Sequence, residues 1–244
     1  MTRERRGANA TRGSHPARRR TGLFGGTFNP IHLGHLRAAE EVRQALGLDE
    51  ILFIPSASPP HKRDQLDDPI APAKQRLEWV ESAITDYDAF SLDRIEIDRE
   101  GPSFLVDTLT QIRERNDDVP PVFIVGEDAF EEMGDWRAPE ELFALADFAV
   151  MTRPPGQLER LEDGIPEIVK GHFKFDPDGQ GAKHKTANTR LSLVPITALD
   201  ISSSKIRQAC RQEESIRFLV PESIRKRIVE SQYYAPREAG RREA

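Results

Sequence analysis

Short apolar runs alternate with helix-like segments along most of the 244-residue sequence, and this alternation strongly restricts the fold. Strands separated by helices form βαβ units, in which the strands pair in parallel and the crossovers are right-handed. Most of the runs are continuously apolar, as strands covered by helices on both faces require. The predicted strands are 21–26, 51–55, 91–97, 122–126, 148–151 and 191–196. The predicted helices are 34–46, 72–86, 103–115, 137–146, 203–211 and 221–231.

The pattern predicts a single doubly wound, Rossmann-like α/β domain with a parallel sheet over residues 20–234. Nothing in the sequence divides this stretch in two, and it contains no internal repeat. The run 91–97 alternates apolar and polar residues, so we expect that strand at an edge or in a half-exposed position. The segments expected to be flexible are 1–19, 56–71, 171–190 and 235–244.

Positive charge is concentrated at the N-terminus. Residues 1–20 hold seven arginines and one glutamate, a charge of +6, whereas the whole chain carries −6 and residues 21–244 therefore carry −12. With almost nothing apolar to bury, this segment is predicted to be a disordered, solvated extension. Two alternatives remain for this segment: it contacts a polyanion, or it is an Arg-rich transit peptide. The acidic body argues against a nucleic-acid-binding protein.

The composition also restricts redox chemistry and location. A single cysteine, Cys210, excludes an internal disulfide and a cysteine-rich metal site. No run reaches the ~18 apolar residues of a membrane-spanning helix, and no secretory signal follows the N-terminal arginines. These features predict a cytoplasmic protein with no membrane partner.

The stretch GLFGGTFNPIHLGHLRAAEE, residues 22–41, crosses from the first predicted strand into the first predicted helix. Gly25 and Gly26 would allow positive φ values and a close approach of backbone N–H groups to a ligand. His32 and His35 lie at the helix start, where N–H groups and the helix dipole favour anions. Two imidazoles there can donate hydrogen bonds to phosphate oxygens, so we predict a phosphate site.

Two other interpretations compete for the histidines. A zinc site on one helix would place them at i and i+4 with further ligands, whereas here the spacing is i and i+3, without HExxH or a cysteine partner. One histidine capping the helix and one exposed would explain either residue, but not both together with the glycines. Polar segments also follow other strands, where ligands bind in doubly wound sheets. They are SASPPHKRD (56–64), GEDAF (126–130), TRPPG (152–156) and TALDISSSKIR (197–207).

Two of these motifs resemble a known superfamily. GGTFNPIHLGHL (25–36) resembles the (G/S)GTFDPxHxGH signature of the nucleotidylyltransferases, and ISSSKIR (201–207) resembles their ISSTxIR signature. Other segments resemble bacterial nicotinate-mononucleotide adenylyltransferases over roughly residues 21–234. They are PPHK (59–62), SFLVDTL (103–109), FIVGEDAF (123–130) with Trp136, VMTRP (150–154) and VPESIRKRI (220–228). The sequence departs at Asn29, where Asp is usual, and at Ser204, where Thr is usual; we expect both to be tolerated.

The resemblance implies that an adenylyl group passes from ATP to nicotinate mononucleotide, giving nicotinate adenine dinucleotide and pyrophosphate in NAD synthesis. The attacking phosphate is already ionised at pH 7, so catalysis would depend on positioning and charge stabilisation. The implied catalytic residues are His32, His35, Lys62 and Arg207. The implied ATP-binding residues are Gly25, Gly26, Thr27, His32, His35, Ser203, Ser204 and Arg207.

For nicotinate mononucleotide the resemblance implies four residues: Thr108 near the carboxylate, Gly126, Asp128, and Trp136 stacking on the pyridine ring. A core role for Trp136 and an ordinary N-capped helix at 203–211 are the alternatives. Mg²⁺ is expected to arrive with ATP, because no carboxylate cluster suggests a protein metal site. The expected partners are the two small-molecule substrates and no nucleic acid; the sequence makes no prediction of oligomeric state.

Three other functions remain as alternatives. The first is another adenylyltransferase of the same superfamily, acting on nicotinamide mononucleotide or phosphopantetheine. The second is a non-catalytic nucleotide-binding regulator, which the intact His32, His35, Lys62 and Arg207 disfavour. The third is a tRNA-charging enzyme with an HIGH-like element, which the small size and the lack of an anticodon-binding domain disfavour.

Overall fold

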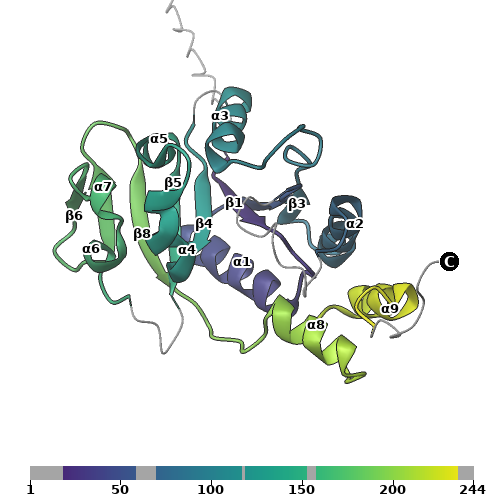
Figure 1. The fold of residues 1–244 in the computed structure, drawn as a ribbon. Helices are drawn as coiled ribbons and strands as arrows, with labels where there is room; N and C mark the ends of the chain where they lie inside the picture. Colours follow the sequence, from purple (N-terminus) through teal and green to yellow (C-terminus); the bar gives the residue numbers. More distant parts are fainter. Residues whose placement is uncertain (1–18, 59–69, 117–118, 153–157, 236–244) are drawn as a thin grey trace, which may run out of the picture.

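The computed structural model describes residues 19–58, 70–116, 119–152 and 158–235. Within them, eight strands form one sheet in the order β3-β2-β1-β4-β5-β8-β7-β6 (Figure 1). The strands are β1 (Thr21–Gly26), β2 (Glu50–Pro55), β3 (Phe90–Leu92), β4 (Val122–Gly126), β5 (Asp147–Thr152), β6 (Phe173–Phe175), β7 (Gly181–His184) and β8 (Arg190–Pro195). The helices are α1 (Leu33–Leu46), α2 (Ala73–Ile84), α3 (Leu105–Arg115), α4 (Glu127–Glu131), the 3-10 helix η2 (Glu132–Asp135), α5 (Pro139–Leu145), α6 (Leu161–Gly164), α7 (Glu167–Lys170), α8 (Ser203–Arg211) and α9 (Glu222–Ser231).

The strand order reverses at β1, which pairs in parallel with β2 on one side and with β4 on the other. The chain first runs outward from β1 through β2 to β3 and then crosses back to β4 and β5. It next reaches the opposite edge at β6 and returns through β7 to β8, which pairs with β5. This is the topological switch point at which doubly wound sheets bind ligands, beyond the carboxyl ends of the strands. The predicted fold class is confirmed.

Two local predictions were wrong. Residues 171–190, expected to be flexible, contain the hairpin β6–β7, which extends the sheet in antiparallel fashion beyond β8. The strand predicted at 91–97 ends at Leu92, because the Asp93 side chain accepts a hydrogen bond from the Ile95 N–H and turns the chain. Its expected edge position is confirmed, since β3 pairs with β2 at one end of the described sheet.

Buried apolar side chains form two clusters, one on each face of the sheet. Neighbouring residues of one strand enter opposite clusters, as Leu23 and Phe24 of β1 do, because side chains of a strand alternate between its faces. Helices α3, α5, α6 and α7 contribute to the first cluster, and α1, α2, α8 and α9 to the second (Figure 1). This double cover explains why the central strands are continuously apolar.

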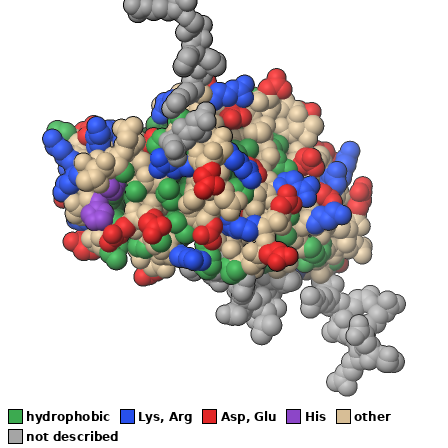
Figure 2. Space-filling view, turned by 90° about the horizontal axis from the view of Figure 1, so that it is seen from above, with side chains coloured by type: hydrophobic (Ala, Val, Ile, Leu, Met, Phe, Trp, Pro, Cys, Tyr) green, Lys and Arg blue, Asp and Glu red, His purple; other side chains and the backbone are tan. Residues whose placement is uncertain are grey.

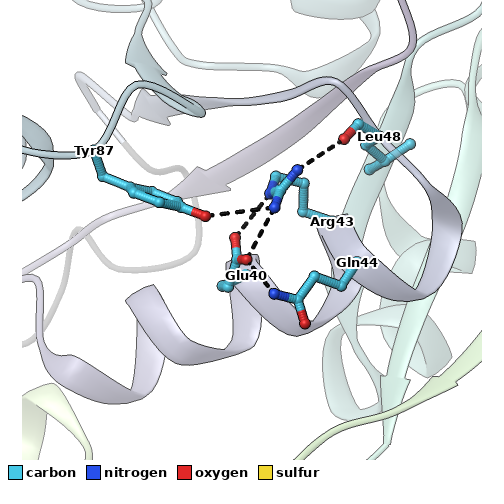
Figure 3. Close-up of polar contacts among 5 residues, drawn as sticks. All are labelled: Glu40, Arg43, Gln44, Leu48 and Tyr87. Carbon is cyan, nitrogen blue, oxygen red and sulfur yellow. Dashed lines mark hydrogen bonds and ion pairs between the residues drawn. The ribbon is translucent and has the colours of Figure 1, made fainter.

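A polar cluster anchors the C-terminal end of α1 (Figure 3). Glu40 accepts from Arg43 Nε at 2.8 Å, and Arg43 in turn donates to the Leu48 carbonyl at 3.3 Å and to the Tyr87 hydroxyl at 3.4 Å. The hydrogen bond from Arg43 is the main cause of the lowered pKa of Glu40. The cluster ties α1 to the loops that lead into β2 and β3 and so fixes the helix that carries both histidines.

The hairpin β6–β7 contains a buried histidine with a predictable effect on stability. His184 Nδ1 accepts from the backbone N–H groups of Thr186 (3.2 Å) and Ala187 (2.9 Å), and burial, together with nearby His172, lowers its pKa. The folded state therefore binds fewer protons than the unfolded state as pH falls below the ordinary histidine value of about 6.5. We expect stability to decline there by at most about 1.4 kcal/mol per pH unit from this group.

The variant His184→Asn tests this expectation, because its side-chain oxygen can replace the Nδ1 acceptor but cannot titrate. Thermal unfolding measured between pH 7.5 and 5 should show a shallower acid slope for the variant than for the wild type. Identical slopes would show that His184 does not contribute to the acid sensitivity of folding.

Several predictions about the ends and the surface lie partly outside the described residues. Of the extension 1–19 only Arg19 is described, and of the tail 235–244 only Ala235. Most of 56–71 also lies outside the described residues. In the part of the chain that the structure describes, no helix is long and apolar enough to cross a membrane. On the described part of the face seen in Figure 2, acidic, basic and apolar side chains are interspersed, so it carries no continuous basic surface.

Candidate active site

Two adjoining cavities lie at the carboxyl ends of β1 and β4. The histidine pocket, of about 570 Å³, is lined by His32, His35, Ser202–Ser204 and Gly126–Ala129, among others. The tryptophan pocket, of about 610 Å³, is lined by Gly25–Thr27, Phe104, Leu105 and Trp136–Arg137, among others. Ala129 lines both, so the pockets meet beside α4. Both have the size of small-ligand sites and lie where the strand order reverses.

The two histidines cap α1 reciprocally. His32 is the N-cap residue, and its Nδ1 accepts from the His35 N–H at 3.3 Å. His35 Nδ1 accepts from the His32 N–H at 3.2 Å. The rings stack with centroids 3.6 Å apart. Because both Nδ1 atoms accept backbone hydrogen bonds, we assign the N–H of each ring to Nε2.

Aromatic packing fixes the orientation of His35. Phe28 and Phe24 meet its ring edge-to-face at centroid distances of 5.2 Å and 6.1 Å. Gly34 lies close to the histidine pair: a Cβ there would be 3.0 Å from His32 Nδ1, so the His32 ring would have to shift by a few tenths of an ångström. Both histidines therefore cap the helix through Nδ1 and line the pocket, whereas the capping interpretation of the sequence had one histidine capping and the other exposed.

Gly25 and Gly26 do not have the positive φ values that the sequence suggested. Phe28 takes the left-handed conformation instead, with φ 47°. A Cβ on Gly26 would lie 2.9 Å from the Phe28 ring, so this glycine makes room for the ring that packs on His35. With Thr27, the glycines line the tryptophan pocket and not the histidine pocket.

Helix α8 brings its N-terminus to the histidine pocket. Ser202 is the N-cap residue and accepts from the Lys205 N–H at 3.2 Å, while Ser203 donates to the Pro30 carbonyl at 2.8 Å. Ser204 lies 3.1 Å from the Ser202 hydroxyl. These serines and the histidines, 170 residues apart in sequence, line one cavity. The ISSSKIR segment is therefore both an N-capped helix and part of the pocket.

Arg207 lies behind this cavity. It is 8% exposed and donates from Nη1 to the backbone carbonyl of Asn29 at 2.7 Å. The Asn29 side-chain oxygen accepts from Tyr234 Oη (2.6 Å) and from the Ala71 N–H (3.0 Å). Burial raises the pKa of Tyr234, which keeps its hydroxyl protonated as a donor. A neutral amide oxygen satisfies both donors, which explains how the chain accommodates Asn29.

Arg76 is a site residue that the sequence did not reveal. It is 1% exposed and donates to the carbonyls of Thr27 (2.6 Å), Ser56 (2.7 Å), Ala57 (3.2 Å) and Ala71 (2.9 Å). Desolvation lowers its pKa. Since Thr27 and Ser56 line the tryptophan pocket, Arg76 fixes the loops after β1 and β2 relative to each other.

The walls of the tryptophan pocket are mainly apolar and aromatic. Trp136 packs partly against the core and also lines the cavity, so its two proposed roles are compatible. Glu96 lines the same cavity, and burial raises its pKa. The sequence did not single out Glu96, because it lies in the run 91–97, which was expected to form a half-exposed or edge strand.

The structure places the remaining predicted residues in different parts of the site. Thr108 is 1% exposed and lies behind the pocket wall, where its hydroxyl donates to Glu96 at 2.9 Å and accepts from Arg99 at 3.1 Å. Gly126 and Asp128 line the histidine pocket and not the tryptophan pocket. Lys62 lies outside the described residues, as does the rest of PPHK.

Comparison with known proteins agrees with this architecture. A family model described as cytidylyltransferase-like matches residues 23–209. The probable nicotinate-nucleotide adenylyltransferase of Trichlorobacter lovleyi is 41% identical over 218 residues, covering 88% of this chain and 99% of the relative. That of Methylococcus capsulatus is 39% identical over 215 residues, covering 88% and 99%.

Solved structures show the same fold. The Plasmodium falciparum nicotinic acid mononucleotide adenylyltransferase complexed with NaAD matches with a TM-score of 0.63 at 18% identity, covering 88% of this chain and 97% of that one. The same protein complexed with APC matches with a TM-score of 0.62 at 17% identity, covering the same shares.

The cytidylyltransferase-like family model spans most of the chain, so the chain belongs to that family. Identity near 40% over almost the full length of the relatives defines the group more narrowly. The chain belongs to the nicotinate-nucleotide adenylyltransferases of the cytidylyltransferase-like family.

Proposed function

We propose that this enzyme joins ATP and nicotinate mononucleotide across the boundary between its two pockets, giving nicotinate adenine dinucleotide and pyrophosphate. The observation that carries the proposal is the stacked pair His32–His35, whose Nδ1 atoms are engaged by backbone N–H groups and whose rings line a cavity adjoining an aromatic pocket. The first pocket suits a polyphosphate, and the second suits a flat aromatic ring.

In the proposed reaction, a phosphate oxygen of nicotinate mononucleotide attacks the α-phosphorus of ATP. The new P–O bond forms as the bond from the α-phosphorus to the oxygen bridging to the β-phosphorus breaks, and pyrophosphate leaves with that bond's electron pair. No proton has to be removed from the nucleophile, so the protein contributes alignment and charge stabilisation.

The histidine pocket supplies the donors. We assign Nε2–H of His32 and His35 to the triphosphate, with His35 nearest the α-phosphate, because charge develops on those oxygens in the transition state. Ser203, Ser204 and the N-terminus of α8 would bind the outer phosphates. Arg207 would act from behind by holding Asn29 and adding positive charge. Lys62 is proposed as a further cation on the family resemblance alone.

The tryptophan pocket would take the pyridine ring. We propose that Trp136 stacks on it, that Gly25–Thr27 line the passage to the phosphates, and that Thr108 supports the wall through Glu96. From the other pocket, Gly126 and Asp128 would face the nucleotides at the junction, with Asp128 accepting from a ribose hydroxyl.

We propose that Mg²⁺ enters with ATP. Among the described residues no group of three or more His, Cys, Asp or Glu side chains could hold a metal ion alone. One side chain fits a cation shared with phosphates: Glu127 lines the histidine pocket, and its Oε2 is buried without a hydrogen-bond partner in the described structure. Mg²⁺ held there would neutralise phosphate charge. We further propose that the enzyme acts in the cytoplasm.

Pyrophosphate release with Mg-ATP and either nicotinate or nicotinamide mononucleotide tests the proposed function. We expect kcat/KM for the acid to exceed that for the amide at least tenfold, since a site built for a carboxylate leaves polar groups unpaired with an amide. A preference for the amide would favour the runner-up activity. Absence of turnover with both would favour a regulatory nucleotide-binding protein.

A further inference from the structure

Tyr234 connects the C-terminal end of the described residues to the turn that leads into the histidine pair. It follows α9, which packs against α2 (Figure 1). The side chain is 3% exposed, and its ring centroid lies 5.9 Å from that of Trp79 in the second apolar cluster. Its hydroxyl donates to the Asn29 side-chain oxygen at 2.6 Å, across 205 positions of sequence. A buried tyrosine hydroxyl needs a hydrogen-bond partner, and here that partner belongs to the β1–α1 junction.

We propose that Tyr234 is a positioning residue for the adenylyl transfer: its hydroxyl holds the Asn29–Pro30 turn, and through this turn the histidine pair, in the geometry that the transition state requires. This inference rests on the proposed function. Tyr234 lines neither the histidine pocket nor the tryptophan pocket. It therefore acts on the reaction through Asn29 and not by contact with a substrate.

Two separate elements hold the turn. Helix α8 bonds its backbone: Arg207 donates to the Asn29 carbonyl at 2.7 Å, and Ser203 donates to the Pro30 carbonyl at 2.8 Å. The C-terminal segment bonds its side chain, through the hydroxyl of Tyr234. The histidine that caps α1 follows the turn by two residues and stacks on the second histidine, so a displaced turn moves both rings.

The hydroxyl of Tyr234 fixes the orientation of the Asn29 amide. The Asn29 side-chain oxygen accepts from this hydroxyl and from the Ala71 N–H at 3.0 Å, and two donors at one oxygen define the plane of the amide. Asn29 is only 4% exposed, so water does not readily replace a lost donor. A misplacement of reacting groups by about 1 Å can cost about 100-fold in rate, so even a smaller shift of the turn should be measurable.

The test compares Tyr234→Phe with Tyr233→Phe in the full chain, at a temperature where both variants are folded. Tyr234→Phe removes the hydroxyl and keeps the ring that packs on Trp79. We expect kcat for pyrophosphate release to fall about 5- to 20-fold and KM for both substrates to stay within twofold, because the histidines are proposed to act in the transition state. The matched control, Tyr233→Phe, removes a hydroxyl that donates to the Ile70 carbonyl at 3.2 Å and should keep kcat within twofold. Each variant loses one hydrogen bond, so the melting temperature should fall in both.

A double-variant cycle tests whether the effect passes through Asn29. In an Asn29→Ala background, Tyr234→Phe should lower kcat less than twofold further, since the acceptor of its hydroxyl is already gone. Additive effects, equal losses of kcat in Tyr234→Phe and Tyr233→Phe, or a Tyr234→Phe enzyme within twofold of the wild type would overturn the assignment and leave the proposed function in place. A wild-type enzyme that releases no pyrophosphate would overturn both.

Discussion

Replacement of His35 by alanine is expected to lower kcat by about 10²- to 10³-fold, the cost of removing one preorganised donor from a developing oxyanion. The cap on Nδ1 and the rings of His32, Phe28 and Phe24 orient the His35 ring, so its Nε2–H is already aligned before the reaction. Pyrophosphate release at saturating substrates measures the effect. A variant within threefold of the wild type would remove His35 from the chemistry.

Alanine also removes the acceptor for the His32 N–H, so a second variant must separate capping from catalysis. His35→Asn places an oxygen near the position of Nδ1 and keeps the cap, but it offers no donor at the position of Nε2. We expect its melting temperature to match the wild type more closely than that of His35→Ala, with turnover equally impaired. His172→Ala, on the β6–β7 side of the molecule and outside both pockets, is the histidine control and should keep its turnover within twofold.

The β1–α1 junction shows how much of the site the sequence can predict. The strand, the Asn29–Pro30 turn, the helix start near Leu33 and the histidine pocket all follow from local rules: an apolar run, a turn dipeptide and orphan N–H groups at a helix end. The convergence of α8 on the same cavity follows from the sheet topology, since polar segments after parallel strands meet at one edge.

What the sequence could not predict depends on contacts between distant segments. The sequence suggested a positive φ at Gly26, but the positive φ occurs at Phe28. The absence of a side chain at Gly26 instead leaves space for the Phe28 ring. Gly25–Thr27 line the tryptophan pocket because of the direction in which the residues at the end of β1 face, and the sequence does not specify this direction. The short hairpin β6–β7 lies in a Gly- and Lys-rich stretch without a strand pattern of its own. Strand β7 forms by pairing with β8, and β6 by pairing with β7.

Arg76 is the clearest case of such a hidden residue, and its replacement is expected to have the largest effect on stability. Arg76→Met keeps most of the side-chain volume but leaves four carbonyl acceptors, from Thr27, Ser56, Ala57 and Ala71, without their donor. Buried polar groups that lose their partner cost about 1–3 kcal/mol each. Allowing for relaxation toward water, we expect at least about 3 kcal/mol of destabilisation, which lowers Tm by roughly 6–12 °C in a domain of this size.

The same substitution should impair activity at temperatures where the variant is folded. Thr27 and Ser56 line the tryptophan pocket, so releasing their loops should raise KM for nicotinate mononucleotide more than KM for ATP. Arg76→Lys can satisfy some of the four carbonyls and should fall between wild type and Arg76→Met in both properties. Arg94→Met removes an exposed i,i+4 pair with Asp98 and should change stability by less than about 0.5 kcal/mol. Equal effects at positions 76 and 94 would mean that the buried guanidinium does not hold the loops of the site together.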